Sequence, residues 1–422
     1  MALAAPPSPP RPAALPGPSV PPARRPVAPP AEPSNDLVPR TSPPANPAPG
    51  GPARPRTVAP PDAGRPARRP RDLFVDVVRA LGTLGVIALH WSMVDATISG
   101  GALHVGNALG SGQGWLVTWL MPLPLLFFAA GAAAGHERRA TTRGPWALTV
   151  HRVRRLVRPV GVLLGVWAAA AAVLLGLGVP AGVVVPVLHK VPQPLWFLGV
   201  YLALTAATTL VTKAVRRLGE RLPAAVGLAV VAVVGVDVLR LGAGHPGAGW
   251  LNLLLVWLIP FTLGVAYAEG TLTRRPAALV AGAAGGIVAA VALIAAGPYP
   301  ISLVGMPGDA FSNLAPPTAP VAAFGIAQVC LAVLARDALT RWAASGRGAR
   351  LVTWVSARSM TLYLWHLTAM FAVAGVVMLV LHERLPVPWT ADWWSTRLTW
   401  FAAMAAALAG LVGLFGRAER RR

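Results

Sequence analysis

The residues best suited to chemistry are an aspartate, an arginine and a histidine in the first long apolar run of the chain. Asp76 and Arg79 are three residues apart, and His90 follows Arg79 after ten intervening residues. In an α-helix these side chains share one face, with Arg79 and His90 roughly 16 Å apart along the axis. Asp76 is then placed to pair with Arg79. Ionisable groups are costly to insert into a membrane, so this polar stripe predicts a functional site.

The element that carries the stripe is predicted to be a transmembrane helix. The chain has 422 residues, of which 55% are hydrophobic and 12% are charged, whereas soluble domains carry about 25% charged residues. Apolar runs near the length of a membrane span recur along it. We therefore predict an all-α, polytopic integral membrane protein with about ten transmembrane helices. These spans are expected near residues 73–92, 115–135, 159–179, 195–213, 222–240, 250–268, 277–296, 318–336, 352–380 and 396–415.

The loops between the predicted spans alternate between arginine-rich and arginine-poor. Loop 136–158 carries seven arginines, whereas loops 93–114 and 297–317 carry neither lysine nor arginine, and loop 180–194 carries only Lys190. Positive residues concentrate on the cytoplasmic side of membrane proteins. The alternation therefore predicts a multi-pass protein of the cell membrane with both termini in the cytoplasm, including a short basic C-terminus at 417–422. The sequence does not define an oligomeric state.

The segment before the first span has a different composition. Residues 1–70 are rich in proline, alanine and arginine and show no helical or strand periodicity, which predicts a disordered cytoplasmic tail. The net charge of +22 is also found in nucleic-acid-binding proteins. Here the arginines flank apolar spans, so we expect membrane lipids and no nucleic acid as partners. Cys330 is the single cysteine, and no metal site is expected because the histidines lack ligand-like spacing.

A second polar constellation lies in the ninth predicted span and a third at the start of the third span. His366 is placed past mid-membrane, at a depth comparable to that of His90, and a neutral imidazole can act as a general base. Arg155 and Arg158 are three residues apart and, with Arg79, would suit a phosphate-bearing ligand. The structural alternatives are a histidine that only packs against a neighbouring helix and arginines that only fix topology or contact lipid headgroups. Asp237 and Arg240 are expected to form a structural ion pair.

Several short motifs follow one another along the chain. They are Arg79-x10-His90, Phe127-Phe128-x-x-Gly131, Arg155-x-x-Arg158, Leu195-Trp196-Phe197-Leu198, Ser312-Asn313 and Tyr363-Leu364-Trp365-His366. This series resembles the integral-membrane acyltransferase-3 family, and the resemblance covers a ten-span domain at residues 71–416. It implies a membrane-bound O-acyltransferase that moves an acyl group, expected to be acetyl, from cytoplasmic acyl-CoA. The implied acceptor is a hydroxyl of a carbohydrate, a glycolipid or a secondary metabolite.

The resemblance also implies roles for individual residues. His90 would deprotonate the acceptor or carry the acyl group, and His366 and Tyr363 would orient the acceptor or stabilise the oxyanion. The phosphates of acyl-CoA, a co-substrate rather than a permanently bound cofactor, would bind Arg79, Arg155 and Arg158. The expected substrate contacts are Asp76, Trp196, Ser312 and Asn313. The alternative is a transporter or lipid flippase, which would share the spans and buried charges but for which no internal repeat is evident.

Overall fold

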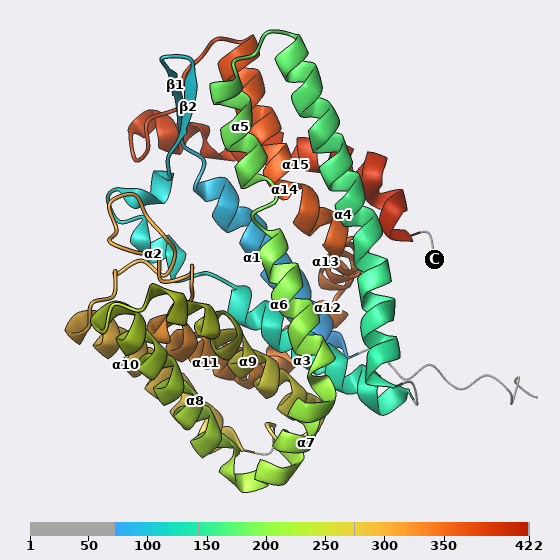
Figure 1. The fold of residues 1–422 in the computed structure, drawn as a ribbon. Coiled ribbons are helices and arrows are strands. Elements are labelled where there is room, and N and C mark those ends of the chain that lie inside the picture. The colour runs from blue at the N-terminus through green and yellow to red at the C-terminus, as the bar shows by residue number, and fades with distance from the viewer. Residues whose placement is uncertain (1–71, 142–143, 274, 421–422) are drawn as a thin grey trace, which may run out of the picture. The chain divides into compact units, whose positions relative to one another are not determined.

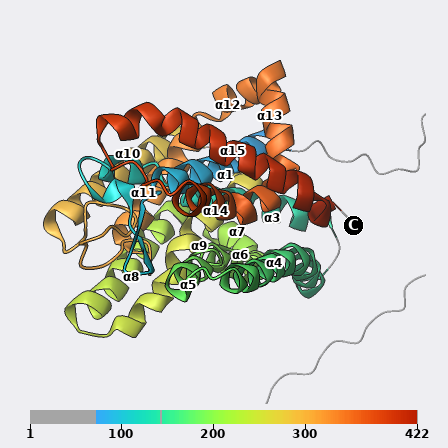
Figure 2. The same cartoon turned by 90° about the horizontal axis from the view of Figure 1, so that it is seen from above.

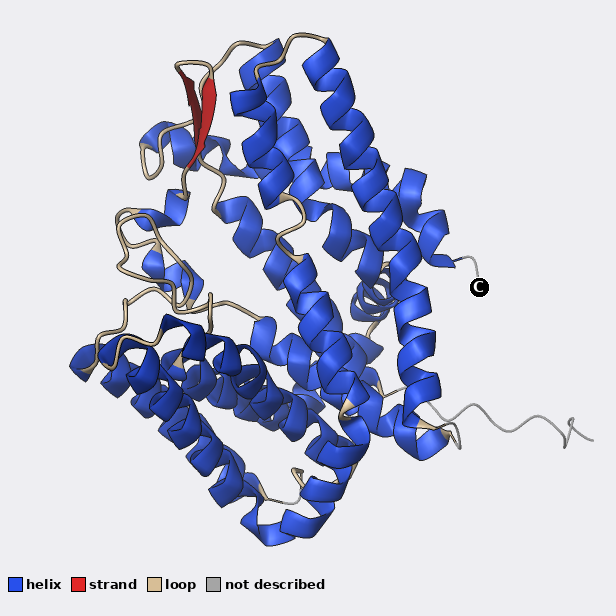
Figure 3. Ribbon diagram, viewed as in Figure 1, coloured by secondary structure: helices blue, strands red, loops and turns tan. Residues whose placement is uncertain are grey.

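The computed structural model describes residues 72–141, 144–273 and 275–420, so the predicted disordered tail at 1–70 lies outside the described residues. The described chain is built of helices joined by loops (Figures 1 and 3), which confirms the all-α prediction. The helices of the first half are α1 (Leu73–Ser92), α2 (Trp115–Thr118), α3 (Leu123–Ala140), α4 (Pro145–Gly176), α5 (Ala181–Lys190), α6 (Leu195–Ala206), α7 (Thr208–Leu218) and α8 (Leu222–Asp237). Those of the second half are α9 (Gly249–Ala268), α10 (Pro276–Ala296), α11 (Ala319–Leu334), α12 (Arg336–Ala344), α13 (Gly346–Ser356), α14 (Ser359–Gly375) and α15 (Ala391–Arg420).

The described residues include one small sheet that the sequence analysis did not predict. Strands β1 (Ala96–Ser99) and β2 (Ala102–Val105) pair antiparallel, with Ser99 opposite Ala102. The turn between them is Gly100-Gly101, and both glycines have positive φ, at 57° and 75°. Two-residue hairpin turns of this kind require positive φ at both positions, which glycine adopts without strain. The hairpin follows α1 directly and so stands next to His90.

The number of spans agrees with the prediction, although several boundaries differ. Within the described ranges, nine helical stretches are long and apolar enough to cross a membrane, and α11 with α12, bent by 58°, would make a tenth. The predicted span 159–179 was wrong at its start, because α4 begins at Pro145 and carries Pro159 in its interior. Proline is favoured in the first helical turn and is tolerated within membrane helices. The predicted span 352–380 is divided, because α13 ends at Ser356 and α14 begins at Ser359.

The fourth and fifth predicted spans also differ from the structure. One stretch covers Ala181–Ala206, as α5 and α6, and the next covers Thr208–Gly242. The second of these consists of α7, a short 3-10 turn, α8 and a π-helical end at Val238–Gly242. The break between α5 and α6 contains Pro192 and Pro194, neither of which can donate a backbone hydrogen bond. This break brings the start of α6 beside α14, as described below.

The arginine-poor loops contact one another at one end of the bundle. Trp389, in loop 381–390, donates to the carbonyl of Ala108 at 2.8 Å, and Trp119 donates to the carbonyl of Ile301 at 3.0 Å. The arginine-rich ends likewise meet one another. Asp72 lies 3.2 Å from His136, Arg336 donates to the Tyr267 hydroxyl at 3.0 Å, and Arg216 pairs with Glu269 at 2.8 Å. The charge alternation therefore corresponds to two distinct ends, while the assignment of one end to the cytoplasm stays a prediction.

Close helix contacts hold α1 in place. In Figure 2, α1 lies between α15 on one side and the group α4–α6 on the other. A Cβ built on Gly82 or Gly85 of α1 would stand 2.8 Å from the Leu126 side chain or 3.1 Å from the Pro122 ring, so glycine at these positions lets α1 and the start of α3 lie close together. Helix α3 packs on α9 through Gly131 in the same way. Small residues at helix contacts are typical of membrane bundles, because they allow the backbones to approach.

A buried aspartate fixes the loop between α10 and α11. The carboxylate of Asp237, which is 1% exposed, accepts hydrogen bonds from Asn252 at 2.9 Å, the Tyr299 hydroxyl at 3.0 Å and the Ala319 amide at 2.8 Å. Burial and the neighbouring carboxylate raise the pKa of Tyr299, which keeps its hydroxyl protonated as a donor. The predicted Asp237–Arg240 ion pair was therefore wrong. Arg240 instead donates to the carbonyl of Pro316 at 3.2 Å.

Candidate active site

Two histidines from distant parts of the chain lie together inside the bundle. His90 is in the last turn of α1 and His366 is in the middle of α14, and their ring centroids are 4.9 Å apart at an interplanar angle of 62°. The neighbouring Trp91 donates its indole N–H to the carbonyl of His366 at 3.1 Å, which ties the two helices together at this level. The structure thus brings together the two histidines that the sequence analysis singled out.

Backbone hydrogen bonds define the tautomer of both rings. Nδ1 of His90 lies 2.8 Å from the carbonyl of Val86, and Nδ1 of His366 lies 2.6 Å from the carbonyl of Tyr363. A carbonyl oxygen only accepts, so we assign the proton of each neutral ring to Nδ1. Each Nε2 then carries the free lone pair that a general base or a nucleophile needs. The Nε2 atom of His366 is buried and has no hydrogen-bond partner among the described residues.

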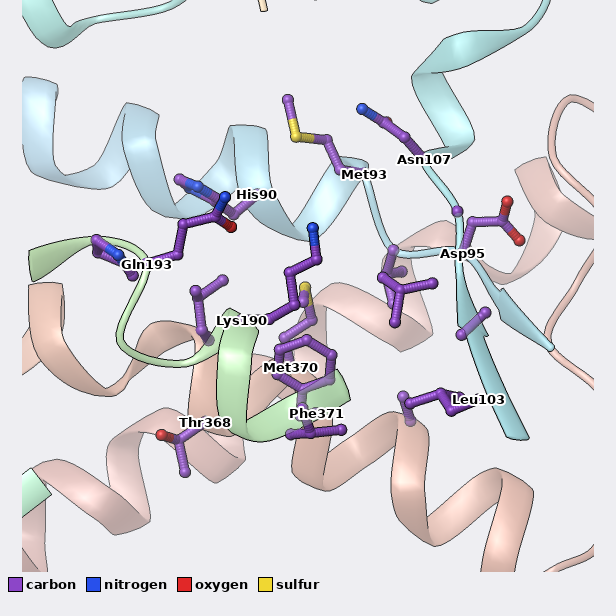
Figure 4. Close-up of a pocket in the computed structure, with 18 of the residues that line it drawn as sticks. His90, Met93, Asp95, Leu103, Asn107, Lys190, Gln193, Thr368, Met370 and Phe371 are labelled. Atoms are coloured by element: carbon purple, nitrogen blue, oxygen red, sulfur yellow. The ribbon is translucent and has the colours of Figure 1, made fainter. Parts of the chain in front are cut away.

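Only one of the two histidines faces a cavity. A cavity of 1290 Å³ is lined by His90 at the end of α1, by the β1–β2 hairpin and by parts of α4, α5, α14 and the loop before α11. His366 is fully buried and does not line it. Most of the lining is apolar, and its polar side chains include Asp95, Asn107, Lys190, Gln193 and Thr368 (Figure 4). Burial raises the pKa of Asp95.

The other residues expected to be catalytic or to bind substrate are distributed unevenly around this cavity. Tyr363 lines it, but its hydroxyl donates to the carbonyl of Pro194 at 2.8 Å and thereby holds the turn before α6. Trp196 and Ser312 also line the cavity. Asn313 does not, because its buried amide donates to the carbonyls of Pro300 and Ser302 at 2.7 and 2.8 Å. In this structure Asn313 shapes the loop before α11.

The arginines lie away from this cavity, toward the arginine-rich end. Arg79 pairs with Asp76 at 2.6 Å, and its Nε is buried without a partner in the described chain. Arg79, Arg155 and Arg152 are all close enough to the Tyr201 hydroxyl of α6 to interact with it electrostatically. Arg152, which the sequence analysis only counted among the seven arginines of loop 136–158, also forms an ion pair with Glu137.

Arg155 and Arg158 are both exposed on α4. Neither makes an ion pair or a side-chain hydrogen bond within the part of the chain that the structure describes. The structure therefore groups Arg79 with Arg155 near Tyr201, and leaves Arg158 one turn further along α4. None of these three lines the large cavity.

Comparison with known protein families identifies the chain. The model of the acyltransferase-3 family, described as an acyltransferase domain, matches residues 72–416. The chain belongs to the acyltransferase-3 family. It is therefore an acyltransferase with multiple transmembrane helices, as the motif series implied. No curated protein and no solved structure matches the chain.

The membership gives the site of this acyltransferase-3 protein a chemical context. Acyl transfer needs a group that removes or accepts a proton, and His90 is the imidazole with a free Nε2 that faces a cavity. The sequence analysis did not select Lys190, Gln193 or Asp95, which also line this cavity. The sequence does mark Lys190 in one way, because it is the single lysine or arginine of loop 180–194.

Proposed function

We propose that this acyltransferase transfers an acyl group, expected to be acetyl, from acyl-CoA to a hydroxyl of an acceptor bound in the cavity beside His90. The observation that carries the proposal is the state of His90. Its Nδ1 is held by the Val86 carbonyl at 2.8 Å, and its ring borders a cavity of 1290 Å³. A fixed neutral imidazole next to a space large enough for two substrates is suited to general-base catalysis.

In the proposed reaction, Nε2 of His90 takes the proton of the acceptor hydroxyl while the hydroxyl oxygen attacks the thioester carbonyl. A new C–O bond forms, the C–S bond breaks, and the departing CoA thiolate receives the proton from His90. The same Nε2 could instead attack the thioester and carry the acyl group as an acyl-imidazole, which the hydroxyl would then cleave. We favour the base role because it needs one chemical step fewer.

His366 is a positioning residue in this proposal. Its ring packs against that of His90 at 4.9 Å, and the Trp91–His366 hydrogen bond fixes α14 against α1. Tyr363 is also a positioning residue, because its hydroxyl donates to the carbonyl of Pro194 and thereby orients the start of α6. An oxyanion role for Tyr363 would require that bond to break.

The arginines at the other end are proposed to bind the phosphates of acyl-CoA. Arg155 and Arg158 are exposed and lack protein partners among the described residues, and Arg79 keeps an unpartnered Nε. Arginine recognises phosphate through paired donors. An acyl-pantetheine arm running along α1 would have to span roughly 16 Å from Arg79 to His90. This arrangement supports a donor on the arginine-rich side and an acceptor on the other.

The test uses membranes that contain the full-length protein, supplied with radiolabelled acetyl-CoA and their endogenous acceptors. We expect His90→Gln to lower transfer by about 100-fold or more, because general bases contribute about 10²–10⁴-fold. His104→Gln is the matched control, since His104 is exposed on β2 and does not line the cavity. Transfer by His90→Gln at the wild-type rate would refute the proposal.

Two further measurements separate the parts of the mechanism. Arg155→Gln should raise KM for acetyl-CoA, while Arg154→Gln, on a different face of α4, should not. An equal effect of the two variants would contradict phosphate binding by Arg155. For the role of His90, purified wild-type protein incubated with labelled acetyl-CoA alone and denatured at neutral pH should carry no label if His90 is a base. A labelled acyl-histidine would instead establish the acyl-carrier role.

A further inference from the structure

Lys190 is the feature of the cavity that the proposed chemistry does not use. It ends α5, and among the described residues it is the one lysine or arginine that lines the cavity. In Figure 4 its side chain extends toward the part of the cavity where His90 and Gln193 lie. Its ammonium makes no ion pair or hydrogen bond within the described ranges. A lone cation therefore borders the space beside His90.

The position of this cation is not explained by membrane topology. The end of the bundle that holds the cavity is the arginine-poor end, where positive residues are depleted. Of the few that remain there, Arg240 donates to the carbonyl of Pro316, Arg397 donates to the carbonyl of Trp393, and Arg384 is exposed outside the cavity. Asp95 also lines the cavity, but it does not pair with Lys190. The charge of Lys190 is thus available to a ligand.

The apolar part of the cavity lining indicates that such a ligand also has an apolar part. The cavity volume of 1290 Å³ exceeds the range of about 300–1000 Å³ that is usual for small-molecule sites. Near Lys190 the wall is formed by Val183, Val184 and Val187 of α5, and it continues to the π-helical end of α14 at Val376–Val380. A small, fully polar acceptor would leave these surfaces exposed to water, whereas a lipid chain would cover them.

We propose that Lys190 binds the anionic group of an amphiphilic acceptor, a lipid whose hydroxyl lies next to a phosphate or carboxylate and whose apolar part covers the α5 wall. This inference rests on the proposed function, because it names the substrate class for the hydroxyl that His90 activates. It makes Lys190 a specificity determinant rather than a residue of the acyl-transfer step. The charge complements the ligand, and the valine wall excludes hydrophilic competitors.

The test measures binding separately from transfer. Purified full-length protein in a neutral detergent is titrated with dioleoyl phosphatidylglycerol or with uncharged dioleoylglycerol, and bound lipid is counted by native mass spectrometry. We expect the wild type to prefer the anionic probe, and Lys190→Met to weaken its binding about tenfold or more. Methionine keeps the length of the apolar stem, so binding of dioleoylglycerol should not change. Equal affinity of the wild type for both probes, or unchanged binding in Lys190→Met, would overturn the proposal.

Four controls make the result specific. Arg384→Met removes a positive charge from the same end outside the cavity, and a loss equal to that of Lys190→Met would overturn the assignment to Lys190. Lys190→Arg should retain the preference. Binding of CoA should be unchanged in Lys190→Met, and loss of CoA binding instead of lipid binding would assign Lys190 to the donor. His90→Gln should bind the anionic probe normally while losing transfer, so failure of the chemistry and failure of the acceptor site can be told apart.

Discussion

The buried Asp237 network allows a quantitative prediction about the stability of the cavity. Asp237→Ala removes the acceptor of three hydrogen bonds, from Asn252, Tyr299 and the Ala319 amide. Hydrogen bonds between membrane helices contribute about 0.6 kcal/mol on average and about 1.7 at most. Three such bonds give about 2 kcal/mol, with an upper limit near 5. The unfolding equilibrium should therefore shift by about 30-fold or more toward the unfolded state.

A second substitution at the same position separates hydrogen bonding from charge. In Asp237→Asn the amide oxygen can still accept from Tyr299 and Ala319, and its NH₂ group can donate to Asn252 once that side chain flips. The flip turns Oδ1 of Asn252, which is buried without a partner, toward the new donor. In exchange, the NH₂ group of Asn252 loses its 3.3 Å bond to the Val233 carbonyl and takes the position that lacks a partner. We therefore expect Asp237→Asn to lose about 1 kcal/mol, which is less than the loss in Asp237→Ala.

The assay is equilibrium unfolding by SDS in mixed micelles, followed by tryptophan fluorescence. Asp337→Ala serves as the control, because the Asp337 side chain is 83% exposed and lies 3.9 Å from Arg336. The loop held by Asp237 also lines the cavity, so transfer should fall with stability in Asp237→Ala. If Asp237→Asn were as damaging as Asp237→Ala, the negative charge and not the hydrogen bonds would hold this loop.

Two further predictions concern the helix contacts and the first helix cap. Gly131→Ala would place a Cβ 2.0 Å from the Phe261 carbonyl oxygen, so we expect the free energy of unfolding to fall by about 1–3 kcal/mol in the same assay. Gly235→Ala is the control, because a Cβ there meets no atom within 4 Å. Equal stability of the two variants would contradict the close contact at Gly131. Burial raises the pKa of Asp72, but hydrogen bonds from His136, the Val75 amide and Tyr267 outweigh it and hold this pKa below its ordinary value of 3.8. The carboxylate then contributes stability above about pH 4 that is lost as the pH falls through the lower folded value. Asp72→Asn should lower the free energy of unfolding at pH 7 by about 0.5–1 kcal/mol but not at pH 3. Because asparagine also caps helices, a loss that does not depend on pH would contradict a role for the carboxylate charge.

The sequence predicted most reliably what depends on local pattern. The first span was expected at 73–92, and α1 covers Leu73–Ser92, because a mostly apolar run follows a capping residue, Asp72. The alternation of arginine-rich and arginine-poor loops predicted the number of membrane crossings, because the arginine content of each loop indicates the side of the membrane on which it lies. Helix α4 was misjudged at its start because its first turns carry the arginines of loop 136–158, which lower the local hydropathy without preventing a helix.

Long-range contacts are the part that the sequence could not provide. The depth of His366 was predictable, but its contact with His90 depends on the packing of α14 on α1. From the sequence, the amide of Asn313 could bind a substrate. Only the fold shows that this amide donates to carbonyls of its own loop. Lys190 stood out only as an exception to the charge pattern. It ends α5 just before the break at Pro192 and Pro194, and its side chain extends toward His90 in Figure 4.

Helix α6 runs from the cavity toward the arginines that are proposed to bind the donor. This helix begins beside the cavity, where Phe197 packs on Tyr363 at 5.3 Å, and continues to Tyr201, which is near Arg79 and Arg155. Under the proposed function, a donor whose phosphates bind the arginines must extend its thioester past these aromatic rings to reach His90. Under the proposed function, the route therefore passes along α6. Prolines interrupt the chain just before α6, and the Tyr363 hydroxyl holds that start through one bond to Pro194, so the proposed route passes α6 beside this bond.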